Sequence, residues 1–310
     1  ALRKTSIGGI VPAMITPFTR DRSVDVNGAH KITDYLIGEG VDGIFLLGSS
    51  GEYQVLSKGQ CQDLVCAVVD HVASRVPVYV GASSPSLEQA IGNVRRVAEW
   101  GADVAVLLPP FYYTYNEGEL LEYFRTIAGE SPIPLMLYNA PGYTRYSLSI
   151  DLLGEISRIP GILGIKDTAM NMDRMVRLIL DDRLRDFKVF QGSDELLGAS
   201  LLMGADGGVN TISNVFPGIL VQMRQAALAK DIERVKHYQK AINSWVDFVR
   251  STTRGDASIN TFLRVVKVAC SIRGLCEPYL AQLDPGPTQE EVQSIKDVLE
   301  SVDCYVSQAI

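Results

Sequence analysis

The chain of 310 residues is 46% apolar and 21% charged, which is ordinary for a globular protein with a sizeable core. Its net charge of −7 argues against nucleic acid as the main partner, because binding phosphate requires a basic face. No segment approaches the roughly 18 continuous apolar residues of a membrane span. We therefore expect one large domain, or one domain with a terminal extension.

Short apolar runs alternate with segments of helical spacing along most of the chain. The helical segments are 26–37, 58–72, 87–100, 119–128 and 172–180, and several helices open on a cap-like residue, namely Ser57, Ser86, Asn116, Ser149 and Asn171. The apolar runs, often rich in Val, Ile and Leu as in strands buried on both faces, are 10–15, 44–47, 78–80, 104–108, 135–137, 162–165, 188–190 and 207–212.

This alternation predicts a parallel α/β fold, and eight repeats favour closure into a (β/α)₈ TIM barrel. A doubly wound open sheet is the alternative, but its G-x-G-x-x-G loop is absent after the first run. After about Pro217 the strand-like runs stop, and 221–229, 232–249, 259–270 and 290–302 have helical spacing. We predict a catalytic barrel over residues 1–228 and a C-terminal helical extension over 229–310.

Cysteine and histidine usage bears on compartment and metal binding. The five cysteines are odd in number and form no Cys-x-x-Cys pair, which is typical of free thiols in a reducing cytosol. The three histidines do not pair at metal-ligand spacing, so we expect no metal. The N-terminal residues lack the apolar core of a signal peptide. Together these features predict a cytoplasmic protein.

In a closed barrel the chemistry lies at the C-terminal ends of the strands. Polar residues follow most of the predicted strands, as Thr16-Pro17-Phe18, Gly48-Ser49-Ser50-Gly51-Glu52, Pro109-Pro110-Phe111-Tyr112-Tyr113, Tyr138-Asn139-Ala140-Pro141, Lys166-Asp167-Thr168 and Gly192-Ser193-Asp194-Glu195. We therefore expect hydroxyls, phenols and one amine to converge on one mouth.

Lys166 directly follows an apolar run, so it ends a predicted strand. Most lysines at strand ends simply reach solvent, but partial burial near a barrel mouth favours the neutral amine. A neutral amine can attack a ketone and form an imine. Tyr138 has a packing interpretation beside a catalytic one, and Asp194 and Glu195 could be first-turn acids of a helix. The turn at 48–51 offers N–H groups and hydroxyls that could hold a carboxylate.

The order of the polar segments at the strand ends resembles the family of N-acetylneuraminate lyase and dihydrodipicolinate synthase. Two further segments add to the resemblance, Gly164-Ile165-Lys166-Asp167 and Gly204-Ala205-Asp206-Gly207-Gly208-Val209. The resemblance extends from about residue 8 to residue 214. It implies that Lys166 is the Schiff-base lysine, that Tyr138 shuttles protons, and that Ser49 is the relay hydroxyl beside it.

The resemblance also implies roles for residues around this centre. Ser50 would hold the carboxylate of pyruvate, Gly48 lies in the same loop, and the backbone of Val209 would line the pyruvate pocket. Tyr112 matches a tyrosine that family members lend across a dimer interface. We accordingly expect a homotetramer, built as a dimer of dimers, and no cofactor.

One position departs from the dihydrodipicolinate synthases. They carry an arginine shortly after Tyr-Asn-x-Pro that grips the carboxylate of aspartate semialdehyde; Tyr143 stands there, and Arg145 follows two residues later. Residues that match contacts to the hydroxylated tail in N-acetylneuraminate lyase are Thr168, Gly192, Asp194, Glu195 and Thr211. Ionised carboxylates only accept hydrogen bonds, so the two acids suit a substrate rich in hydroxyls.

The sequence therefore predicts a class I aldolase in which Lys166 forms a Schiff base with pyruvate or another 2-oxo acid. The small-molecule substrate would be a 2-oxo-3-deoxy sugar acid or a similar 2-oxo acid, cleaved to or made from pyruvate and an aldehyde; dehydration is a second outcome. Dihydrodipicolinate (4-hydroxy-tetrahydrodipicolinate) synthase is the alternative within the family. A non-catalytic 2-oxo acid sensor is the alternative from another class, and the joint presence of Lys166, Tyr138 and Ser49 speaks against it.

Overall fold

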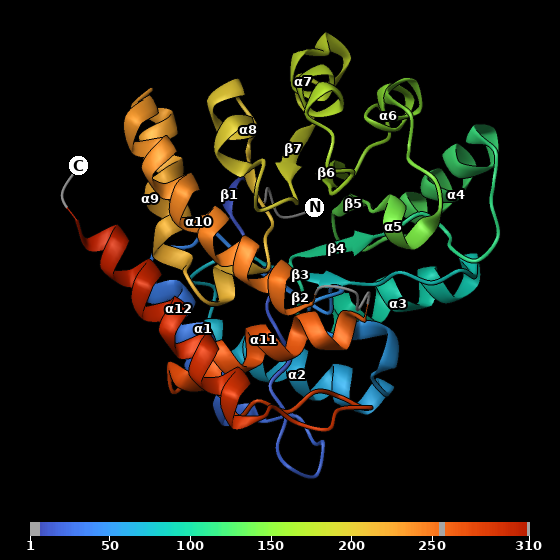
Figure 1. The fold of residues 1–310 in the computed structure, drawn as a ribbon. Coiled ribbons are helices and arrows are strands. Elements are labelled where there is room, and N and C mark those ends of the chain that lie inside the picture. Colours follow the sequence, from blue (N-terminus) through green and yellow to red (C-terminus); the bar gives the residue numbers. More distant parts are fainter. Residues whose placement is uncertain (1–6, 254–257, 309–310) are drawn as a thin grey trace.

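The computed structural model describes residues 7–253 and 258–308 (Figure 1). Within them, eight parallel strands form one sheet in the order β1-β8-β7-β6-β5-β4-β3-β2. The strands are β1 (Gly9–Ile10), β2 (Ile44–Leu46), β3 (Val78–Gly81), β4 (Val104–Leu107), β5 (Leu135–Asn139), β6 (Ile162–Asp167), β7 (Lys188–Gln191) and β8 (Gly207–Gly208).

The segment after β1 joins β2 and closes the sheet into a barrel. Ala13 pairs with Phe45 in a parallel bridge. The Met14 N–H donates to the Phe45 carbonyl, and the Phe45 N–H donates to the Pro12 carbonyl, both at 2.9 Å. Since β1 also pairs with β8, the chain forms the (β/α)₈ TIM barrel that the alternation of runs predicted.

Helices follow the strands and surround them (Figure 1). They are α1 (Val26–Gly38), α2 (Lys58–Val72), α3 (Leu87–Glu99), α4 (Glu117–Glu130), α5 (Pro141–Thr144), α6 (Ile150–Ile156), α7 (Met172–Leu180), α8 (Leu197–Met203) and α9 (Pro217–Leu228), with short 3₁₀ turns η1 (Tyr53–Val55), η2 (Asp182–Leu184) and η3 (Ile212–Asn214). Each of the five predicted cap residues accepts a hydrogen bond from the N–H three positions later.

The predicted lengths of the first and last strands were wrong. The first was expected over 10–15, but β1 ends at Ile10, and Pro12 has no N–H to continue a ladder. The last was expected over 207–212, but β8 ends at Gly208 and Ile212 already begins η3. The turn is held by the Ser213 hydroxyl, which donates to the Asn210 carbonyl at 2.5 Å.

Side chains fill the inside of the barrel. Its buried cluster includes Phe45, Tyr79, Met136 and Phe190, which come from different strands. A second and larger cluster lies between the strands and the helices. The interior of the barrel is therefore packed rather than hollow.

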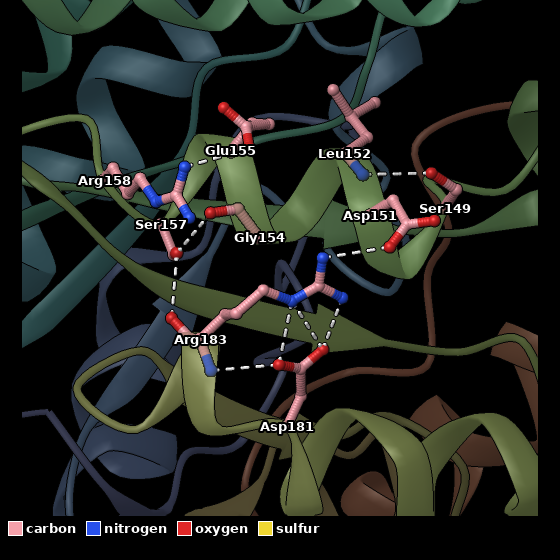
Figure 2. A network of polar contacts seen from close by, with 9 residues as sticks. All are labelled: Ser149, Asp151, Leu152, Gly154, Glu155, Ser157, Arg158, Asp181 and Arg183. Atoms are coloured by element: carbon pink, nitrogen blue, oxygen red, sulfur yellow. Dashed lines mark hydrogen bonds and ion pairs between the residues drawn. The ribbon is translucent and has the colours of Figure 1, made fainter.

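A surface network of hydrogen bonds and ion pairs joins α6 and the residues beside it to η2 and Asp181 (Figure 2). The Arg183 guanidinium donates to Asp181 at 2.7 Å and to Asp151 at 2.9 Å. A Cβ on Gly154 would come within 3.2 Å of that guanidinium, so glycine leaves the room that Arg183 occupies. Arg183 is 40% and Asp151 86% exposed, so this network joins two surface elements and contributes little to stability.

Three helices follow the barrel: α10 (Ile232–Thr252), α11 (Ile259–Ile272) and α12 (Gln289–Ser307). A buried ion pair connects α11 to the loop after β2, because Lys267 Nζ contacts Glu52 and both side chains are almost fully buried. Glu52 also accepts from the Ala281 N–H at 2.7 Å, and Lys267 donates to the Tyr279 carbonyl at 2.8 Å. The division at residue 228 stays a prediction. None of the described helices is long and apolar enough to cross a membrane.

Candidate active site

A cavity of about 470 Å³ lies at the C-terminal ends of the strands, a size that suits a small ligand. Its wall includes the predicted site residues Ser49, Ser50, Tyr138, Lys166, Thr168, Gly192, Asp194, Glu195 and Thr211. The cavity thus gathers side chains from the ends of β2, β5, β6, β7 and β8, as a barrel mouth should.

Lys166 stands on β6 directly beside Tyr138 on β5, because these two residues are register partners. The lysine is only 5% exposed, and its Nζ lies 4.2 Å from the centroid of the Tyr138 ring. A Cβ on Gly192 would come within 2.2 Å of the Thr168 methyl and within 3.2 Å of Lys166 Cε. Glycine at position 192 therefore keeps the space beside the amine open.

The environment of Tyr138 makes its phenol a better acid. Burial by itself raises the pKa of this phenol, but the nearby Lys166 charge lowers it. Hydrogen bonds with Thr168 and Ser49 act in the same direction as Lys166, so the pKa of Tyr138 lies below its ordinary value. A phenol of this kind can exchange a proton with a reacting group near the amine.

The opposite wall offers hydroxyls. The Ser50 and Thr211 side chains are hydrogen-bonded to each other at 2.5 Å. Val209 is fully buried inside the barrel, and its N–H donates to the Gln191 carbonyl at 2.9 Å. Gly48 lies at the end of β2 against Phe45, whose ring a Cβ would approach to 2.7 Å. The Ser50 and Thr211 hydroxyls thus lie on the cavity wall, and the carboxylate-binding role that the resemblance implied for Ser50 stays a prediction.

Two carboxyl groups line the side of the cavity that follows β7. Burial raises the pKa of Asp194 to about 6, although Asn210 and Lys166 nearby act in the opposite direction. Asp194 Oδ1 is buried and makes no hydrogen bond within the described part of the chain. Glu195 instead forms an ion pair with Arg250 of α10 at 2.6 Å.

Some of the expected residues lie elsewhere. Tyr112 is 77% exposed, has a left-handed φ of 84°, and does not line the cavity. Arg145 is also exposed and ends α5, whereas Tyr143 lines the cavity. At this point the cavity wall therefore carries the Tyr143 phenol and not the Arg145 guanidinium.

The sequence analysis missed parts of the site. Asp167 Oδ2 accepts from Asn139 Nδ2 and from Arg174 Nε, both at 2.8 Å, and this holds the end of β6 that carries Lys166. Val246 of α10 and residues 259 and 262 of α11 also line the cavity. The role of Asp167 could have been predicted, because it directly follows Lys166 in the sequence. The sequences of α10 and α11 contain no pattern that would have placed them at the cavity.

The model of the dihydrodipicolinate synthetase family matches residues 6–301. The chain belongs to this family. A 4-hydroxy-tetrahydrodipicolinate synthase from Methanothermobacter thermautotrophicus is 34% identical over 238 residues, which cover 75% of this chain and 84% of the relative. An uncharacterized DapA-like lyase from Halobacterium salinarum is 28% identical over 289 residues, covering 93% of this chain and 89% of the other.

A solved structure of the same family is also similar. YagE, a prophage protein from E. coli K12 crystallised in complex with pyruvate, has a TM-score of 0.88 at 28% identity and covers 96% of this chain and 99% of its own. The predicted family and enzyme class are confirmed: the protein is a lyase or aldolase of the dihydrodipicolinate synthase family. The roles of individual residues stay predictions.

Proposed function

We propose that the enzyme binds pyruvate or a related 2-oxo acid as a Schiff base on Lys166 and cleaves or forms a 2-oxo-3-deoxy sugar acid. The observation that carries the proposal is the Lys166 amine against the Tyr138 phenol, in a cavity that also has hydroxyls and two carboxyl groups in its wall. Among the described residues that line the cavity, Lys166 is the only one with a basic side chain.

Each step of cleavage has a group at hand. The Lys166 amine adds to the keto carbon, water leaves, and the protonated imine forms. The bond between the third and fourth carbons then breaks as its electron pair moves toward the imine, while Tyr138 takes the proton of the hydroxyl on the fourth carbon. The aldehyde departs, the enamine regains a proton at the third carbon, and water releases pyruvate and the free amine.

Synthesis of 4-hydroxy-tetrahydrodipicolinate is the second candidate, and the names of the relatives favour it. Its aldehyde substrate carries a second carboxylate. Tyr143 offers that carboxylate one uncharged donor, whereas an arginine offers two parallel charged ones. Hydrogen bonds to charged groups contribute roughly 1.5–3 kcal/mol. We therefore expect aspartate semialdehyde to react at least about tenfold less well than it would with arginine at this position.

The expectation of a homotetramer with Tyr112 reaching a neighbouring subunit belongs to this proposal. Tyr112 is largely exposed beside the also exposed Tyr113 and has a strained left-handed conformation, which supports a role outside its own subunit. Analytical ultracentrifugation of the wild type and of Tyr112→Phe would give the assembly, and the loss of activity in Tyr112→Phe would give the role of the phenol.

Borohydride trapping tests the Schiff base. Reduction in the presence of pyruvate should fix one three-carbon adduct per chain on Lys166, and Lys166→Arg should give none. No adduct in the wild type, or one on Lys188 or Lys267, would contradict the mechanism and favour the sensor. Pyruvate release from 2-oxo-3-deoxy sugar acids, compared as kcat/KM with condensation of aspartate semialdehyde, tests the substrate. Efficient condensation that Arg145→Ala abolishes would show that the tail site was misassigned.

A further inference from the structure

One face of α10 forms part of the cavity wall, although this helix follows the barrel in the sequence. Gln239, Val246 and Arg250 are seven and then four residues apart, so they lie on the same side of the helix. Gln239 accepts from the Gly198 N–H at 2.8 Å and donates to the Asp194 carbonyl at 3.1 Å. Val246 lines the cavity itself. The loop between β7 and α8 is therefore fastened to α10.

Arg250 holds the side chain of Glu195 in that loop. Both of its terminal nitrogens contact the carboxylate, one on each oxygen, at 2.6 Å. Two parallel contacts fix the direction of a carboxylate as well as neutralising it. Each carboxylate oxygen can accept more than one hydrogen bond, so Glu195 keeps acceptor capacity toward the cavity that it lines.

The pair is too exposed for a purely structural role to be its main effect. Arg250 is 55% and Glu195 27% exposed, and ion pairs of this exposure contribute little to stability. The pair can still fix the position of the Glu195 carboxylate. This matters because a hydrogen bond to a substrate requires its acceptor to lie within a fraction of an ångström of the right place.

We propose that Arg250 is a positioning residue for the tail of the substrate, which holds Glu195 as an acceptor for hydroxyl groups remote from the keto carbon. The proposal rests on the proposed function and narrows it: the preferred aldehyde has a neutral, polyhydroxylated tail, and α10 takes part in selecting it.

Two aldehydes distinguish tail selection from the chemistry at Lys166. Condensation with pyruvate is measured for erythrose, which presents several hydroxyls, and for acetaldehyde, which presents none. Arg250→Met should lower kcat/KM for erythrose roughly tenfold, mainly through KM, since hydrogen bonds to charged groups are the ones lost. The rate with acetaldehyde and the trapping of pyruvate on Lys166 should stay within about twofold of wild type. Arg250→Lys, which keeps the charge but not the two-pronged contact, should fall between.

A double-variant comparison tests whether Arg250 acts through Glu195. In a Glu195→Gln background, Arg250→Met should cause no further loss with erythrose, because coupled residues are not additive. Lys236→Met is the matched control, since it removes another exposed cation from α10 that pairs with Glu233.

The outcomes separate the two proposals. A wild-type enzyme that forms no adduct with pyruvate contradicts the proposed function. With the adduct intact, equal losses for erythrose and acetaldehyde, or additive effects of the two substitutions, overturn the role of Arg250.

Discussion

Asp194→Asn should stabilise the protein, and the gain should depend on pH. Burial raises the pKa of Asp194 from an ordinary value of 3.8 to about 6, so the folded state holds this proton more tightly than the unfolded chain. Each pKa unit corresponds to about 1.4 kcal/mol. The difference between the ordinary and the raised pKa of Asp194 therefore corresponds to a cost on the order of 3 kcal/mol for keeping its carboxylate ionised in the folded protein.

Because the pKa of Asp194 is raised on folding, the wild type loses stability relative to the variant as the pH rises. A group with a raised folded-state pKa contributes its full stabilisation below about pH 4, and that contribution is lost as the pH rises toward 6. Above pH 6 the wild type carries the whole cost, and Asp194→Asn does not. The free energy of unfolding in urea, measured at intervals from pH 4.5 to pH 8, should therefore show a gain for the variant that grows by about 1–3 kcal/mol.

Asp63→Asn provides the control, because it removes an exposed carboxyl from α2. A gain for Asp194→Asn that is constant across this pH range would refute the reasoning, since a neutral amide differs from the acid only when the acid ionises. A loss of stability at pH 8 would show that Asn210 and Lys166 favour the carboxylate more strongly than burial disfavours it.

Three further substitutions test the site and its support. Tyr138→Phe should lower kcat by about 10²–10⁴ with the fold intact; unchanged turnover would reduce Tyr138 to a packing residue. Lys267→Met should lower the free energy of unfolding in urea by about 3–5 kcal/mol, because the Glu52 carboxylate is left buried without its cation. Adding Glu52→Gln should restore part of this loss, and a Lys267→Met variant as stable as the wild type would refute the reasoning. Gly192→Ala should abolish borohydride trapping on Lys166, because the new methyl fills the space beside the amine; undiminished trapping would mean that the loop gives way.

The barrel could be predicted because parallel strands buried on both faces have continuous apolar sequences. The starts of five helices could be predicted from a cap residue such as Ser57. The ends of β1 and β8 could not be predicted from the sequence. Apolar residues continue past Pro12, but there the chain pairs with β2 through Ala13 and Phe45 rather than with β8. The residues at strand ends were predictable because parallel strands end at one rim. Arg250 was not, because Glu195 lies 55 residues away and nothing local identifies the pair.

Glu52 and Lys267 restrict which parts of this enzyme can be exchanged with those of a relative. The carboxylate stands on a loop of the barrel and the ammonium on α11, 215 residues later. A chimera whose C-terminal helices came from a parent without this lysine would bury the carboxylate alone. Recombination between barrel and helices should therefore succeed only when both parents carry compatible residues at these two positions.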